Sequence, residues 1–80
     1  MEIINPQVYG DIPLEGHADL SCGLSVYFYG RGERCTMSIC KPDGSTIWEK
    51  EYPMPDAVNA PESTVIAAME RAAQDWRASL

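Results

Sequence analysis

The chain has 80 residues and a formal net charge of −6, from 12 acidic and 6 basic residues. This length provides for one small core, so we expect residues 1–80 to fold as a single domain. A hydrophobic fraction of 45% excludes a chain that is disordered throughout, because such chains are poor in apolar residues. The acidic balance disfavours direct binding to nucleic acid or to an anionic membrane, since both require a basic surface.

The number of cysteines and the N-terminal residues indicate the cellular compartment. The three cysteines are an odd number, which argues against a closed disulfide framework. The start of the chain has no basic segment followed by an apolar one, so no secretory signal is visible. No run approaches the roughly 18 apolar residues of a membrane-spanning helix. We therefore expect a cytoplasmic protein.

Residues 1–17 are rich in turn formers and predict an irregular N-terminal arm. Glu2–Ile4 or Gln7–Tyr9 could add an edge strand to it. Residues 18–52 predict an antiparallel β-meander, because their alternating segments are joined by short links.

The clearest strand signal is the alternation over Asp19–Tyr29, which a helix could not use to bury one side. The expected buried face holds Leu20, Cys22, Leu24, Val26 and Phe28, and the expected outer face holds Ser21, Gly23, Ser25, Tyr27 and Tyr29. Residues 30–33 then predict a turn, because two glycines there tolerate positive φ.

Two further strands are expected, at Arg34–Lys41 and Thr46–Tyr52, separated by a Pro-Asp-Gly-Ser turn. The first should bury Cys35, Met37 and Ile39 and expose Thr36, Ser38 and Cys40. A three-residue loop would place Ile39 opposite Ile47, whereas a loop of two or four residues places it opposite Trp48. We favour the second register, with Cys35 opposite Tyr52, because it buries Trp48 in the core.

A C-terminal helix is predicted over residues 59–79. Asn59 is a good N-cap, and Glu62 three residues later completes a capping-box pattern. The apolar stripe comprises Val65, Met69, Ala72, Trp76 and Leu80. The expected fold class is therefore α+β, with three or four antiparallel strands and one amphipathic helix packed on one face.

Motifs that would dictate a chemistry are missing from the pattern. His17 is the single histidine and falls in a glycine-flanked segment, while Cys22 and Cys35 are expected in the core, where thiols are inert. The spacing of Cys35 and Cys40 lacks the paired short intervals of zinc sites. Glu49 and Glu51 share a strand face, but a solvated edge strand explains them as well as an acid–base pair does. We expect a non-enzymatic protein without metal or cofactor.

Because one helix covers one face of a sheet, the opposite face is the candidate interface. Tyrosine is enriched at protein interfaces, although an ordinary half-solvated sheet face would also accommodate it. The candidate partner-binding residues are Tyr27, Tyr29, Asp19, Glu49, Glu51 and Asp56.

The function that these features favour is binding to a macromolecule, in particular to a protein with a basic surface. The size, the acidity and the lack of catalytic residues are similar in general appearance to phage and mobile-element inhibitors, including anti-CRISPR proteins. A bacterial immunity protein, a small subunit of a larger assembly and a homodimer are the alternatives. A small-ligand or enzymatic domain is disfavoured, because a core this small leaves little volume for a pocket of about 300 Å³ or more.

Overall fold

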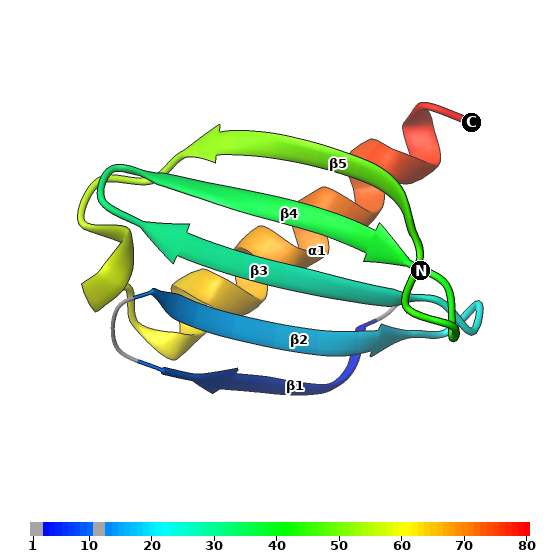
Figure 1. Cartoon of the computed structure of the whole chain (residues 1–80), viewed down its shortest axis with the longest axis horizontal. Coiled ribbons are helices and arrows are strands. Elements are labelled where there is room, and N and C mark those ends of the chain that lie inside the picture. Colours follow the sequence, from blue (N-terminus) through cyan, green and yellow to red (C-terminus); the bar gives the residue numbers. More distant parts are fainter. Residues whose placement is uncertain (1–2, 11–12) are drawn as a thin grey trace.

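The computed structural model describes residues 3–10 and 13–80, and it has an α+β fold (Figure 1). Neighbouring strands of one antiparallel sheet follow in chain order: β1 Ile3–Tyr9, β2 Leu14–Leu20, β3 Ser25–Arg31, β4 Arg34–Cys40 and β5 Thr46–Pro53. A short 3₁₀ helix, η1 Ala57–Asn59, leads into helix α1, Glu62–Ala78. The predicted antiparallel sheet with one C-terminal helix is confirmed, with five strands instead of three or four.

The N-terminal segment differs from the irregular arm that was predicted, because it forms the hairpin of β1 and β2. Both candidate edge segments lie in β1, apart from Glu2, which is outside the described residues. The turn formers Asn5 and Pro6 mark a break in the β1–β2 register, where Asn5 has a φ of 50°. An edge strand tolerates such a bulge because a missing N–H there costs no central ladder bond.

The predicted strand over Asp19–Tyr29 is wrong, because the chain reverses in its middle. β2 ends at Leu20 and β3 begins at Ser25, and the N–H of Leu20 donates to the carbonyl of Leu24 at 2.8 Å. Gly23 takes a φ of 92° in this turn, a conformation that glycine adopts without strain. As a result Cys22 is exposed and does not belong to the core.

The core lies between the inner face of the sheet and α1, which crosses that face diagonally from β1 towards β5 (Figure 1). The sheet contributes Leu14, Ala18, Leu20, Val26, Phe28, Cys35, Met37 and Ile39, and the helix contributes Val65, Met69, Ala72, Ala73 and Trp76. The predicted helical stripe is thus confirmed except at Leu80, which is 83% exposed beyond the end of α1.

The predicted pairing of β4 with β5 is confirmed: Ile39 lies opposite Trp48, and Cys35 lies opposite Tyr52. A register shift follows Ile39 and leaves Ile47 as the extra residue of a bulge, 41% exposed. Trp48 packs against the core but is only partly buried.

Two local predictions around the turns and the helix start are corrected. Cys40 was expected to face outward but is buried, with its Sγ 3.7 Å from the hydroxyl of Thr46. Asn59 does not cap α1. It lies in η1 and donates from its side-chain amide to Asp56 Oδ1 at 2.9 Å, while the helix begins after Pro61 without a side-chain cap.

Gly30 was predicted to be a turn residue, but it lies in β3, between Leu14 and Cys35 on the neighbouring strands. A Cβ at this position would stand 2.8 Å from Cε1 of Phe28, so the absence of a side chain leaves room for that ring. The turn itself is formed by Gly32 and Glu33, with Gly32 at a φ of 64°.

A polar contact fastens the edge strand β5 to the helix. The hydroxyl of Tyr52 donates to Asp75 Oδ2 at 2.6 Å, and Lys50 and Arg71 lie 3.9 and 3.8 Å from the same oxygen. Burial, and then the hydrogen bond to Asp75, raise the pKa of Tyr52 well above its usual range.

We predict that Trp76→Ala lowers the free energy of unfolding by about 3–5 kcal/mol, because the substitution leaves a cavity under α1. Leu80→Ala is the control, since Leu80 is 83% exposed and should change stability by less than about 0.5 kcal/mol. Urea denaturation followed by circular dichroism measures both values. Equal losses in the two variants would contradict this packing.

A second prediction follows from the raised pKa of Tyr52. A group whose pKa is higher in the folded than in the unfolded state stabilises the fold below its unfolded pKa, about 10 for tyrosine, and loses that contribution as the pH rises further. Stability should therefore fall as the pH rises above about 10, and Tyr52→Phe should flatten the fall. Ile47→Val, at an exposed side chain that does not titrate, should leave the pH profile of unfolding unchanged. Identical pH profiles of unfolding for Tyr52→Phe and the parent protein would refute the raised pKa of Tyr52.

Candidate functional site

The sheet face opposite α1 is not covered by any described element of the chain (Figure 1). Strand pairing arranges its side chains in rows across the sheet. One row runs from His17 through Tyr27 and Ser38 to Glu49. The next row holds Glu15, Tyr29, Thr36 and Glu51. We call this surface the free face. It also includes Tyr9 of β1, which lies opposite Glu15.

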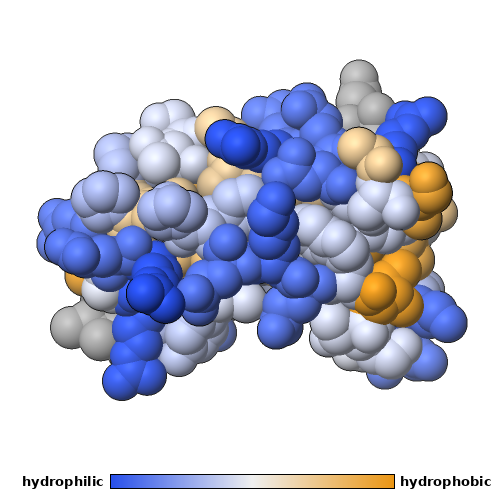
Figure 2. Space-filling view, turned by 90° about the horizontal axis from the view of Figure 1, so that it is seen from above, coloured by the Kyte–Doolittle hydropathy of each residue, from blue (hydrophilic) through white to orange (hydrophobic). Residues whose placement is uncertain are grey.

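A hollow of about 340 Å³ lies on the free face. It is lined by Tyr9, Glu15, Gly16, Tyr27, Phe28, Tyr29, Thr36, Ser38 and Glu49. All five strands contribute to it, and the outline of the molecule is indented on this side, along the lower edge of Figure 2. We call it the tyrosine hollow.

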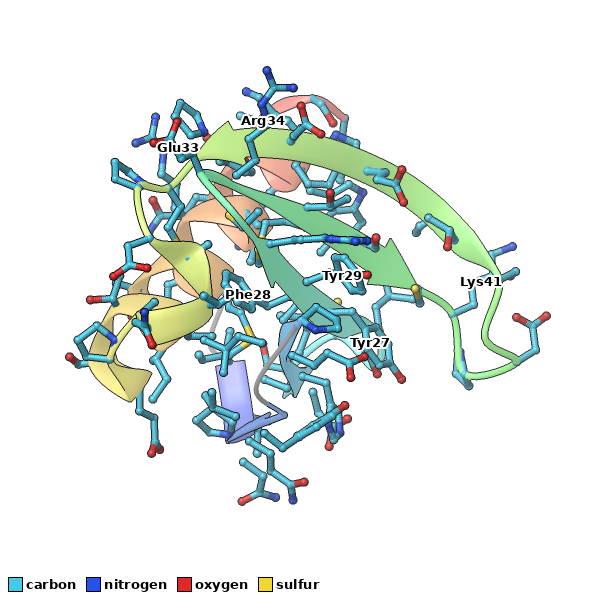
Figure 3. The ribbon with its side chains drawn as sticks, turned by 60° about the vertical axis from the view of Figure 1, so that its left-hand side comes forward. Tyr27, Phe28, Tyr29, Glu33, Arg34 and Lys41 are labelled. Atoms are coloured by element: carbon cyan, nitrogen blue, oxygen red, sulfur yellow. The ribbon has the colours of Figure 1, made fainter. Side chains whose placement is uncertain are left out.

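Three tyrosines give the hollow its walls, and all three are accessible. Tyr9, Tyr27 and Tyr29 are 46, 42 and 41% exposed, so a large part of each residue is accessible to a partner. Figure 3 shows Tyr27 and Tyr29 on the free face, with Phe28 between them directed to the opposite side, towards the helix. The predicted outward placement of Tyr27 and Tyr29 is confirmed.

His17 belongs to the same cluster. Its ring stacks on Tyr27 with centroids 5.5 Å apart and an angle of 19°, and it meets the ring of Tyr9 edge-on at 6.5 Å. The sequence prediction placed His17 in a loop and did not include Tyr9 or Glu15 in the site. The alternation of Leu14, Gly16 and Ala18 with Glu15 and His17 was the signal that could have identified β2.

The acidic candidates fall into two groups. Asp19, Glu49 and Glu51 lie on the free face, where Glu49 accepts from Ser38 at 3.1 Å and Asp19 from Ser25 at 3.5 Å. Glu51 forms a 3.0 Å ion pair with Arg34 at the end of the strands. Asp56 lies away from this face, before η1, and interacts with Asn59. The structure thus brings five of the six predicted residues onto one face and leaves Asp56 out.

His17 and Cys35 lie on opposite faces of the sheet. His17 points to the free face, whereas Cys35 is buried against the helix side of the sheet. Burial raises the pKa of the Cys35 thiol and favours its protonated, unreactive form. Within residues 3–10 and 13–80, no three His, Cys, Asp or Glu side chains are grouped so that they could hold a metal ion.

No helix in the described part of the chain has the length and apolar character needed to cross a membrane. Comparison with family models, with curated proteins and with solved structures finds no match to this chain. What the chain can bind is therefore inferred from the chemistry of the free face.

The burial of Cys35 and Cys40 predicts that a Cys22→Ser variant resists thiol reagents while folded. Ellman's reagent should label less than about a tenth of its thiols in the native state and both thiols in denaturant, because the reagent reaches the buried sulfur atoms only when the chain unfolds. Rapid modification of either thiol in the native variant would contradict the position of β4 in the core.

Proposed function

We propose that this protein is a non-enzymatic interaction module that docks a basic segment of a protein partner on its free face. The observation that carries the proposal is the tyrosine hollow, whose lining combines three exposed tyrosines with two glutamates and includes no lysine or arginine.

The tyrosines favour a protein as the partner. Tyrosine offers a rigid contact surface and a polar hydroxyl, and it is enriched at the energetic centres of protein interfaces. Among the described residues, the hydroxyls of Tyr9, Tyr27 and Tyr29 make no hydrogen bond within the chain. They are available to pair with polar groups of a partner.

The charge of the free face favours a basic partner. Glu15 and Glu49 line the hollow and Asp19 lies on the same face, in a chain of net charge −6. Complementary charge raises the rate of encounter and suppresses wrong partners. A second copy of this chain is disfavoured, because joining two free faces would bring the acidic groups of both copies together.

Inhibition is the cellular role that suits such a module best. A small acidic protein that occupies a basic, nucleic-acid-binding surface would act like the inhibitors carried by phages and mobile elements, anti-CRISPR proteins among them. An immunity protein or an assembly subunit would use the same face in the same way.

The test is an NMR titration of the labelled protein with a synthetic Arg/Lys/Gly peptide and with its Glu-substituted counterpart. Amide shifts should map to β2, β3 and β4 for the basic peptide, and they should weaken as salt rises. The double substitution of Tyr27→Thr and Tyr29→Thr should reduce affinity about tenfold, because central aromatic contacts dominate such interfaces. Threonine keeps a high strand propensity, so the sheet should remain intact.

Glu70→Gln is the matched control for charge, since Glu70 is exposed on α1 and far from the hollow in the fold. It should bind the basic peptide like the parent protein. Equal binding of the acidic peptide, or shifts confined to α1, would refute the proposed function.

A further inference from the structure

We propose that the tyrosine hollow is a receptor site for one arginine side chain of the partner. This inference rests on the proposed function and specifies its chemistry. It assigns a ligand class, an alkyl guanidinium, to a particular site on the free face.

The size and the lining of the hollow suit such a group. Its volume of about 340 Å³ is enough for a single long side chain, and it opens on one side to solvent. Tyr9, Tyr27 and Tyr29 supply aromatic surface, while the small polar side chains of Thr36 and Ser38 lie among them. Aromatic rings attract a cation placed over their faces, most strongly where water is partly excluded.

The carboxylates of the hollow are without an ion pair to a described lysine or arginine. Among the described residues, no lysine or arginine forms an ion pair with Glu15 or Glu49. In the same row as Glu15, by contrast, Glu51 is paired with Arg34 at 3.0 Å. The acidic groups inside the hollow are therefore the ones that an incoming cation can neutralise.

The chain already contains the same type of contact on the other side of the sheet. The ring of Tyr52 lies 5.8 Å from the guanidinium carbon of Arg71 and 5.3 Å from Lys50 Nζ, next to the carboxylate of Asp75. That arrangement combines a tyrosine ring, a carboxylate and cations from the same chain. The lining of the tyrosine hollow has tyrosine rings and carboxylates but no lysine or arginine among the described residues.

Arginine fits this lining better than lysine does. The guanidinium group is planar, is less strongly hydrated than an ammonium group, and can stack on a ring while it donates to carboxylates at its edge. His17 stacks on Tyr27 and restricts the motion of that ring, so part of the wall is already ordered before the ligand arrives.

The experiment compares three peptides that share the same lysine-containing flanks and differ at the central residue, which is arginine, citrulline or lysine. Citrulline keeps the shape of arginine and removes its charge. NMR titration should show the arginine peptide binding about fivefold more tightly than the citrulline peptide, with the largest differences at Gly16 and Tyr29. The lysine peptide should fall between them.

Substitutions in the hollow should remove the preference for arginine. Glu15→Gln and Glu49→Gln should each reduce the arginine-to-citrulline ratio about threefold, and Tyr29→Leu should do the same through loss of the ring. Glu70→Gln should leave the ratio unchanged. Thermal melts establish that each variant is folded before its ratio is compared.

The outcomes separate the two proposals. Equal binding of the arginine and citrulline peptides at the free face would overturn the arginine site and leave the docking function standing. Equal binding of arginine and lysine peptides would also overturn the assignment to arginine. If no basic peptide binds but free argininamide shifts Gly16 and Tyr29, the site stands and the docking function fails.

Discussion

The structure depends on one constraint: an 80-residue chain with a single long helix can cover one face of its sheet. The apolar side chains of all the inner strands pack against the stripe of α1 that includes Met69 and Trp76. The opposite face must then remain in contact with water, and its residues have to be polar or amphipathic. Tyrosine meets this requirement, because its ring gives contact area while its hydroxyl stays solvated. The uncovered face is thus a direct consequence of how the core is built.

Strand order converts this face into a site. The β1–β2 hairpin adds Tyr9, Glu15 and His17 alongside the tyrosines of β3, and β5 places Glu49 at the other side. Without the hairpin, Tyr27 would lie near an open edge, and the hollow would lack one wall. The bulge at Asn5 and the charged side chains of β5 also make both edges poor templates for pairing with another strand, which leaves the face as the main surface for recognition.

Three of the six basic residues form ion pairs with carboxylates outside the hollow. Lys50 of β5 and Arg71 of α1 both lie beside Asp75, and Arg34 pairs with Glu51 at the strand ends. The exposed pairs contribute little to stability, so their main effect is to determine which carboxylates are neutralised within the molecule. Glu15 and Glu49 are not among them, and this distribution connects the fold to the preference for a basic partner.

The local sequence pattern determined three features: the outward side chains of Tyr27 and Tyr29, the pairing of Ile39 with Trp48, and the buried stripe of the helix. Strand alternation, loop length and helical spacing are properties of short segments, so they can be recognised without the tertiary structure. It did not reveal the reversal after Leu20, since the alternation continues unchanged through the turn. Nor did it place Tyr9, Glu15 and His17 in the site. Their position follows from which strands pair, and pairing is decided by contacts between segments that are distant along the chain, which only the tertiary structure contains.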